Sequence, residues 1–348
     1  MEYTVSIKKE GIIMTIKDLS VQTGYSVGTI SRVLNNQPNV SEKARALILK
    51  AAEECNFQLN SNAKQLKQQQ GTSIIVISKG ISNELFHRMV ETLQTRVAQT
   101  NYPLVVDFID ENDNEVRRAL QLCREKKPRG ILFLGGNREH FLADFDKISV
   151  PSVLVTNDAT GLPFENLSSV SSNDIQAAKM AIDHLISLGH RKIAVIGGDR
   201  SLSDITELRF RGCCDSFREH GIPFDEKNYY IPARFSFAEG YRAAKELLKK
   251  GREFTALFAM ADVMAIGATR ALLDAGKRVP EDVSVLGLDG LEIGNYLIPR
   301  LATVCQSLDT LAQESLALLL AKIEKNEGFR HVNVPVYLEW KESARKID

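Results

Sequence analysis

The sequence predicts an α/β protein in which a small helical domain precedes a larger domain of two similar lobes with parallel sheets. Three observations predict this fold class. Three short helical segments occupy residues 15–58. From residue 72 onward, short β-branched runs alternate with amphipathic segments, which is typical of strand–helix–strand units with parallel strands. This alternation occurs in two halves of similar build that divide near residue 172, so we expect two lobes.

Length and composition agree with a folded, multidomain protein. The chain has 348 residues, 44% of them apolar and 25% charged. Its 44 basic residues balance its 44 acidic ones, but residues 15–70 hold seven Lys and Arg against four Asp and Glu. Five cysteines without a CxxC spacing favour reduced thiols. We find no apolar run of membrane-spanning length and no signal-peptide core, and therefore expect a cytoplasmic protein.

The helical domain is predicted over residues 15–58, after an N-terminal extension at 1–14. Thr15, Ser26 and Ser41 each precede a helical pattern at the position of a capping residue, and Gly24 ends the first helix. The third helix has the apolar stripe Ala44, Leu47, Ile48, Ala51 and Cys55. Two helices joined by a short glycine-containing turn, with a third in support, form a helix-turn-helix. The basic surplus favours DNA binding over a plain three-helix bundle.

In such a domain the second helix enters the major groove of DNA, and its first turn faces the base edges. Val27 offers a methyl surface to a thymine, Gly28 permits close approach, and Arg32 can pair with a guanine or a phosphate. Tyr25, Ser31 and Asn35 are candidates for phosphate or sugar contacts. The head residues expected on DNA are Thr15, Tyr25, Ser26, Val27, Gly28, Thr29, Ser31, Arg32 and Asn35.

Residues 59–71 are predicted to be a hinge. The stretch NSNAKQLKQQQG at 60–71 is too polar to fold alone, yet Leu59, Ala63 and Leu66 share one helical face. We expect a helix that forms on DNA, with Leu66 as an apolar wedge in the minor groove. The alternative is a linker whose Leu66 covers its own domain. The hinge residues expected on DNA are Asn60, Ala63, Lys64, Leu66 and Lys67.

The larger domain is predicted over residues 72–348. Its expected strands are the runs at 73–78, 102–109, 130–136, 150–157, 190–198, 228–234, 255–260 and 283–290. Ligands of parallel sheets bind at the carboxyl ends of the strands, so a cleft between two lobes joins two such ends. The histidines and glycine pairs lack the spacing of a metal site, a dinucleotide site or a P-loop. We therefore expect no cofactor, and we find no nucleophile motif or paired carboxylates that would support an enzyme.

Eight motifs occur in order between residue 15 and about residue 340. They are TIKDLSVQTGYSVGTISRVLN, FQLNSNAKQLK, LGHRKIAVIGG, RFRG, FAEGY, ADVMAIGATRAL, RVPEDVSVLGLDG and LATVCQ. In combination they resemble the LacI/GalR family of bacterial transcriptional repressors. The resemblance implies a DNA-binding headpiece, a hinge, and a two-lobed effector domain like the periplasmic sugar-binding proteins.

The resemblance also implies three crossings between the lobes, which we place near residues 172, 305 and 328. Lobe 1 would comprise about 72–172 and 306–328, and lobe 2 about 173–305 and 329–340. The last strand, HVNVPVYLEW at 331–340, would belong to lobe 2.

By resemblance, the protein is expected to be a homodimer on a pseudo-palindromic operator, controlled by a sugar, sugar phosphate or purine in the cleft. Arg209 and Asp289 would grip the ligand and Phe235 would stack on it. The effector-binding residues carried over by motif are Asn83, Phe86, Thr156, Asn157, Arg209, Phe235, Asp262, Asp289 and Gln306. Ala261, before Asp262, stands where the family usually has asparagine, so this position offers the effector no amide hydrogen bond.

Two further departures lie in the hinge. Leu59 and Lys64 stand where the family often has proline and arginine. The family's wedge position falls on Leu66 and its closely packed hinge position on Ala63. The effector can act as corepressor or inducer. A transporter-type binding protein made of residues 72–348 is the alternative, and the basic head and the missing signal peptide count against it.

Overall fold

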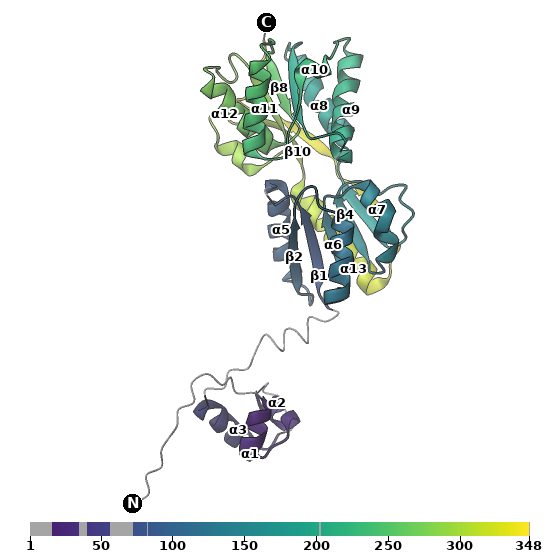
Figure 1. Cartoon of the computed structure of the whole chain (residues 1–348), viewed down its shortest axis with the longest axis vertical. Coiled ribbons are helices and arrows are strands. Elements are labelled where there is room, and N and C mark those ends of the chain that lie inside the picture. The colour runs from purple at the N-terminus through teal and green to yellow at the C-terminus, as the bar shows by residue number, and fades with distance from the viewer. Residues whose placement is uncertain (1–15, 35–39, 56–71, 82, 202, 348) are drawn as a thin grey trace, which may run out of the picture. The chain divides into compact units, whose positions relative to one another are not determined.

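The computed structural model describes residues 16–34, 40–55, 72–81, 83–201 and 203–347. It divides into two compact units, Met1–Gln68 and Gln69–Asp348 (Figure 1). The predicted extension at 1–14 and the predicted hinge at 59–71 lie outside the described residues.

In the smaller unit three helices pack around a small apolar core. They are α1 (Ile16–Thr23), α2 (Val27–Leu34) and α3 (Glu42–Glu54). Leu19 of α1, Ile30 and Val33 of α2, and Ile48 of α3 are all buried in this core. One face of each short helix is thus covered by the other two, and the predicted helix-turn-helix is confirmed.

Local signals set the ends of these helices. Gly24, directly after α1, has a φ of +73°, which glycine adopts without a steric penalty. Ser26 Oγ accepts a hydrogen bond from the Thr29 N–H at 3.2 Å, and Ser41 Oγ accepts one from the Ala44 N–H at 3.4 Å. Both serines therefore cap the helices that follow them, as predicted.

One residue of the predicted α3 stripe is exposed. Leu47 keeps 45% of its surface exposed, whereas its neighbour Ile48 is fully buried. The buried positions Ala44, Ile48 and Ala51 recur at helical spacing, and Leu47 falls at the border of this narrow stripe. The expectation that Leu47 is buried was therefore wrong.

The larger unit contains one parallel sheet per lobe (Figure 1). Among the described residues, the first sheet has the order β11-β5-β4-β3-β1-β2, and all its paired strands are parallel. Its strands are β1 (Ile74–Lys79), β2 (Leu104–Ile109), β3 (Gly130–Leu134), β4 (Ser152–Thr156), β5 (Leu167–Ser171) and β11 (His331–Asn333). Its helices are α5 (Glu84–Val97), α6 (Glu115–Lys126), α7 (Arg138–Asp144), η1 (Phe145–Lys147) and α13 (Leu308–Lys325).

The second sheet repeats this pattern with the order β12-β10-β9-β8-β6-β7. Only the β10–β12 pair at its edge is antiparallel among the pairs described. Its strands are β6 (Ile193–Gly197), β7 (Tyr230–Pro232), β8 (Ala256–Ala259), β9 (Ser284–Asp289), β10 (Ala302–Gln306) and β12 (Val336–Glu339). Its helices are α8 (Asp174–Ser187), α9 (Asp204–Glu219), α10 (Glu226–Tyr229), α11 (Phe237–Lys249), α12 (Asp262–Asp274) and η2 (Glu292–Tyr296).

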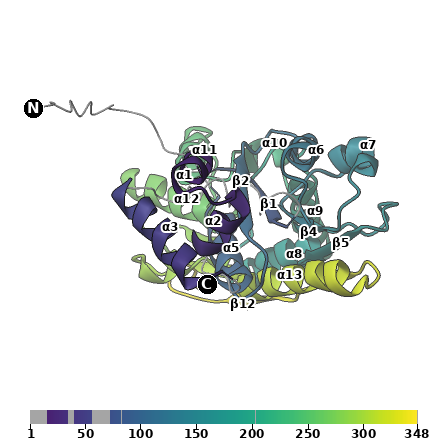
Figure 2. The same ribbon diagram turned by 90° about the horizontal axis from the view of Figure 1, so that it is seen from below.

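Strand alternation sends apolar side chains into a helical layer on each face of each sheet. In β1, Ile74 and Val76 join the core formed with α5 and α13, while Ile75 and Ile77 join the core formed with α6 and α7. α13 packs against α5 and runs along one side of its lobe (Figure 2). Both faces are covered, which explains why the strands appear in the sequence as continuous apolar runs. Each buried isoleucine stabilises the fold by roughly 1.5–3 kcal/mol.

The chain passes between the lobes three times. β5 of the first sheet leads into α8 of the second lobe, and β10 of the second sheet leads into α13 of the first. The third crossing lies at Val334 and Pro335 rather than near 328. The predicted lobe 2 strand at 331–340 is in fact two strands, since β11 pairs with β5 in the first lobe and β12 with β10 in the second. Proline lacks an N–H, and Pro335 interrupts the pairing.

Two strands were missing from the predicted runs. β5 reads LSSVS, and two of its buried serines accept backbone hydrogen bonds: Ser169 Oγ from the Ala159 N–H at 3.0 Å and Ser168 Oγ from the Arg330 N–H at 3.2 Å. The other missing strand is β10, which pairs in parallel with β9. Within the described residues, no helix combines the length and apolarity needed to cross a lipid bilayer.

Candidate functional site

A cleft of about 860 Å³ lies where the carboxyl ends of the two sheets face each other. Its first-lobe wall comes from residues that end or follow β1, β2, β3 and β4, and its second-lobe wall from residues that follow β6, β7, β8 and β9. Parallel strands all deliver their carboxyl ends to the same edge of a sheet, so loop side chains of both lobes converge here. The cleft is large enough for a small organic ligand.

Most of the residues predicted to bind an effector meet in this cleft. Asn83 and Phe86 stand at the start of α5, and Phe235 precedes α11. The predicted residues that line the cleft are Asn83, Phe86, Thr156 and Asn157 from the first lobe and Arg209, Phe235 and Asp289 from the second. Their contact with a ligand stays a prediction.

Two predicted residues, Asp262 and Gln306, lie behind the cleft wall. The fully buried Asp262 accepts hydrogen bonds from Thr303 Oγ1 at 2.6 Å and from the Leu291 N–H at 2.7 Å. Burial raises the pKa of Asp262 to about 6. Asp262 therefore ties α12 to β10 and to the loop after β9. Its carboxylate faces these partners and does not line the cleft. Gln306 Nε2 donates to Asp289 Oδ1 at 2.9 Å and reaches the cleft only through that carboxylate.

Arg209 is already engaged within its own lobe. Its Nε donates to Asp174 Oδ1 at 2.7 Å, and its Nη1 donates to the Met260 carbonyl. Both charged side chains are almost fully buried. Burial raises the pKa of Asp174, and the neighbouring guanidinium opposes that rise. The predicted pair of ligand-binding charges, Arg209 and Asp289, is therefore joined by a third charged residue, Asp174, which neutralises the Arg209 guanidinium.

The strands that carry Thr156 and Asp289 end in strained backbone. Thr156 closes β4 with a φ of +74°, and Asp289 closes β9 with a φ of +133°. Positive φ costs a residue with a side chain roughly 1–3 kcal/mol, and such strain concentrates at ligand sites. Burial raises the pKa of Asp289 to about 7, although the nearby Arg209 charge opposes the rise. Each lobe therefore aims one strained strand end at the cleft.

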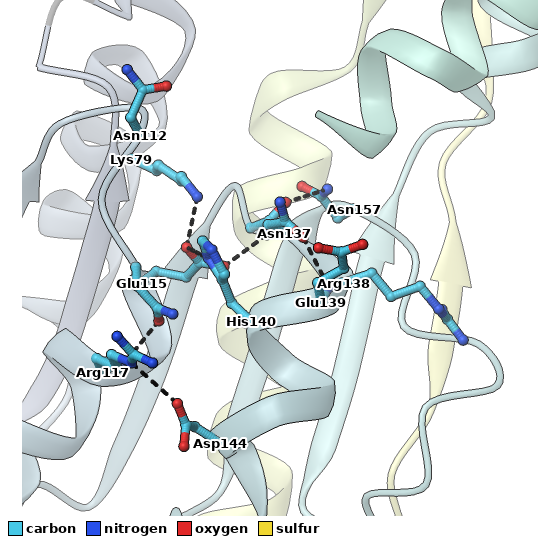
Figure 3. Close-up of polar contacts among 12 residues, drawn as sticks. Lys79, Asn112, Glu115, Arg117, Asn137, Arg138, Glu139, His140, Asp144 and Asn157 are labelled. Atoms are coloured by element: carbon cyan, nitrogen blue, oxygen red, sulfur yellow. Dashed lines mark hydrogen bonds and ion pairs between the residues drawn. The ribbon is translucent and has the colours of Figure 1, made fainter. Parts of the chain in front are cut away.

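On the first-lobe wall a buried carboxylate organises three neighbours (Figure 3). Glu115, the first residue of α6, is fully buried. It accepts hydrogen bonds from Lys79 Nζ at 2.7 Å and from the Asn137 N–H at 2.7 Å, and its Oε2 lies 3.0 Å from His140 Nδ1. Lys79 and Asn137 both line the cleft. Glu115 therefore fixes two cleft-lining residues from different strand ends: Lys79, the last residue of β1, and Asn137, which follows β3.

Arg234 joins the two lobes across the cleft. It follows β7 in the second lobe, and its Nη2 donates to Asp110 Oδ2 at 2.8 Å in the first lobe. Its Nε donates to Glu111. All three side chains line the cleft and remain partly exposed. The lobes are therefore linked by an ion pair at their facing edges.

The second helix of the smaller unit presents the residues predicted to read DNA. Val27, Gly28 and Arg32 are exposed, whereas Thr29 and Ser31 are half-buried. Ser26 is exposed and its Oγ lies 2.9 Å from Thr29 Oγ1, and Tyr25 is half-buried against the core. Of the other predicted DNA contacts, Thr15, Asn35, Asn60, Ala63, Lys64, Leu66 and Lys67 lie outside the described residues.

Comparison with known proteins matches both units. The family model "Bacterial regulatory proteins, lacI family" covers residues 15–60, and the "Periplasmic binding protein-like domain" covers 182–344. The transcriptional regulator MalR of Clostridium butyricum is 30% identical across 96% of this chain and 100% of its own length. The chain belongs to the LacI/GalR family of bacterial transcriptional regulators.

Further LacI-family relatives support the assignment. The regulator GalR of Escherichia coli K12 is 32% identical across 88% of each chain. A structure of the Lac repressor bound to ONPG in the repressed state is 26% identical, covers 95% of this chain and 99% of its own, and has a TM-score of 0.74. The family predicted from the sequence motifs is confirmed.

Sequence reasoning missed several residues of this LacI-family cleft, among them Lys79 and Arg234, and it missed the buried Glu115 that holds Lys79 in place. Lys79 directly follows the first predicted strand run, at 73–78, and Arg234 ends NYYIPAR, so their position at strand ends could have identified them. Glu115 gave no such signal, because it opens a helix and its partners come from elsewhere in the chain.

Proposed function

We propose that this LacI-family protein is a dimeric transcriptional repressor whose operator affinity is set by a small molecule in its cleft. The observation that carries this proposal is the combination, in one chain, of an exposed helix-turn-helix reading face and a polar, ligand-sized cleft. Because its target is chromosomal DNA, we place its action in the cytoplasm. Its family relatives named above are regulators, and we propose no catalytic role.

On DNA, we propose that α2 lies in the major groove. Val27 and Gly28 begin this helix and are exposed, so the first turn can meet base edges, as in other helix-turn-helix proteins. Arg32, one turn further on, can reach a guanine or a phosphate. The Ser26 cap fixes the end of the helix that approaches the bases.

In the cleft, we propose a sugar or sugar derivative. A LacI-family regulator from Enterococcus faecium, 25% identical with a TM-score of 0.70 over 80% of this chain, was solved with bound ribose. The ribose operon repressor of Halalkalibacterium halodurans is 29% identical over 95% of this chain. Phe86 and Phe235 offer aromatic surface, and amide, hydroxyl and carboxylate groups surround them. This mixture suits a ring with several hydroxyl groups.

For the dimer, we propose a surface on one side of the larger unit. Arg88 of α5 pairs with Glu292 of η2 at 3.3 Å, and His87 of α5 packs edge-on against Phe108 of β2 at 5.5 Å. Elements of both lobes therefore adjoin α5. Exposed apolar side chains gather on these elements and the loops beside them: Ile81, Phe108, Ile293, Tyr296 and Ile298. An apolar surface shared by two lobes fits a second copy of the chain.

Linkage between the two units supplies the mechanism. Effector and operator affinities must affect each other equally, whichever ligand binds first. A ligand that changes the angle between the lobes changes the separation of the two first lobes in the dimer, and hence of the segments that lead to DNA. We propose that Leu66 of the predicted hinge then enters or leaves the minor groove.

A mobility-shift assay with DNA from upstream of the protein's own gene tests this function. We expect a salt-sensitive shift, because phosphate contacts release counterions. An Arg32→Ala variant should weaken the shift, and Lys192→Ala, a surface lysine of the larger unit, is the matched control. If the full-length protein does not shift this DNA either with or without the sugars tested, the proposed repressor function is refuted.

A further inference from the structure

We infer that the cleft accepts an uncharged, hydroxyl-rich effector and rejects phosphorylated and carboxylated ones. This inference rests on the proposed function and narrows its ligand class. Its basis is that the basic side chains of the cleft already form ion pairs with carboxylates of the protein.

Each basic side chain that lines the described part of the cleft is paired with a carboxylate. These residues are Lys79, Arg209, Arg234 and Arg242. Arg242 Nε donates to Glu239 at 2.9 Å, and its Nη1 donates to Glu246 at 3.0 Å. Arg234 spans Asp110 and Glu111. The guanidinium groups that could have held a phosphate are therefore neutralised by the protein.

The two least exposed pairs make the strongest case. Lys79 keeps only 12% of its side chain exposed, and its partner Glu115 is fully buried at 2.7 Å. Arg209 and Asp174 are buried to a similar extent. A phosphate that recruited either cation would leave a buried carboxylate without its partner, and an unpaired buried charge is strongly unfavourable.

Acidic groups remain after these pairs are formed. Asp199 and Asp289 also line the cleft, and both accept hydrogen bonds from uncharged groups: Ser201 donates to Asp199, and Gln306 donates to Asp289. No ion pair to either carboxylate occurs in the part of the chain that the structure describes. Even without Asp289, whose pKa burial raises to about 7, carboxylates outnumber cations around the cleft, and a cleft focuses that negative field on its contents.

The same surface suits hydroxyl groups. A hydroxyl can donate to a carboxylate such as Asp289 and accept from an amide such as Asn157. Thr206 lines the cleft wall, and its side chain is fully buried. A Cβ added at Gly198 would lie 2.4 Å from Thr206 Oγ1, so the wall here is tightly packed and adds no charge to the cleft.

Calorimetric titration of the full-length protein tests the inference with glucose, galactose and ribose, each beside its monophosphate ester, and with inorganic phosphate. We expect any sugar that binds to lose at least about 100-fold in affinity when phosphorylated, because like charges meet in the cleft. Inorganic phosphate should bind the wild type more weakly than it binds the variant described next. A monophosphate that binds more tightly than its parent sugar overturns the inference.

The decisive variant is Glu115→Gln, which keeps the shape of the side chain but frees the Lys79 ammonium. It should bind inorganic phosphate at least about 10-fold more tightly than the wild type does. Glu253→Gln is the matched control, since it also removes a carboxylate from a lysine pair, with Lys192, but outside the cleft. If Glu115→Gln fails to fold, the double variant Asp110→Asn with Glu111→Gln, which frees the Arg234 guanidinium, provides the same comparison.

Equal phosphate affinity in the wild type and the folded variant would overturn the inference, whether both bind or neither does, because charge pairing would then not be what excludes anions. This result would leave the proposed function as a transcriptional regulator untouched. Operator shifts measured on the same preparations test that separately, so a failure of the inference and a failure of the proposed function can be told apart.

Discussion

Replacing Arg209 by alanine should destabilise the larger unit by about 3–5 kcal/mol. The change removes a buried 2.7 Å ion pair and a hydrogen bond to the Met260 carbonyl. It also leaves the Asp174 carboxylate buried without its cation. Because burial already raises the pKa of Asp174 and Arg209 opposes that rise, the variant should be more stable at low pH than at neutral pH, relative to the wild type.

Urea unfolding followed by the fluorescence of Trp340 measures this effect. Trp340 is the one tryptophan of the chain and directly follows β12 in the second lobe, which also holds Arg209. The double variant Arg209→Met with Asp174→Leu removes both charges and should recover most of the loss, since apolar replacements of a buried pair are often neutral. Arg278→Ala, which breaks an exposed pair with Asp282, is the control and should have little effect.

The reasoning is refuted if Arg209→Ala costs less than about 1 kcal/mol, the range of an exposed ion pair. It is also refuted if the double variant is no more stable than the single one. The outcome matters for ligand studies, because loss of sugar binding in Arg209→Ala reports on the ligand contact only where the variant is shown to be folded.

Four further predictions concern other parts of the molecule. Burial raises the pKa of Asp289 from 3.8 to about 7, so the folded protein favours its protonated form; that contribution to stability is complete below about pH 4 and is lost as the pH rises through about 7. Asp289→Asn should flatten this part of the Tm profile between those values, and an unchanged profile would contradict the assignment. Ile298→Glu places a charge on a side chain that is 94% exposed, and should shift the dimer toward monomer in light scattering without lowering Tm; a dimer that persists would exclude this surface. Arg32→Ala should reduce the slope of log affinity against log salt by about 0.9 if the guanidinium holds a phosphate, and an unchanged slope with altered base preference would place it on a guanine. Ile48→Ala leaves a cavity in the small head core and should cost it about 2–5 kcal/mol, abolishing the operator shift while the Trp340 transition stays in place; normal operator binding would show that the core tolerates the loss.

Much of the fold could be predicted because its determinants are local. Helices with a capping serine and a terminal glycine, such as α2 after Ser26 and α1 before Gly24, occur where the sequence predicts them. Buried apolar runs identified most strands of both sheets, because both faces of each sheet are covered. β5 escaped detection, since its serines bond within the fold and give no apolar signal.

The candidate site could be predicted only in part. Motif and strand-end position brought Asn83, Phe86, Phe235 and Asp289 to the right cleft. The same reasoning placed Asp262 there, although the structure turns this carboxylate inward to Thr303. The position of a residue along a strand determines which end of the sheet it lies at. Whether its side chain then faces the cavity or bonds to a buried partner depends on neighbours from other segments of the chain.

The sequence by itself determined most of the succession of helices and strands, the division into a head and two lobes, and the family. The elements follow from periodicity, caps and turn residues, which act within a few neighbouring positions, and the family follows from the order of its motifs. Only the tertiary structure decided that the last strand divides between the lobes, that Arg209 pairs with Asp174, and that Arg234 reaches Asp110, 124 residues away in the chain. Such pairings depend on which surfaces the fold brings together, and no local pattern encodes a contact between segments so far apart.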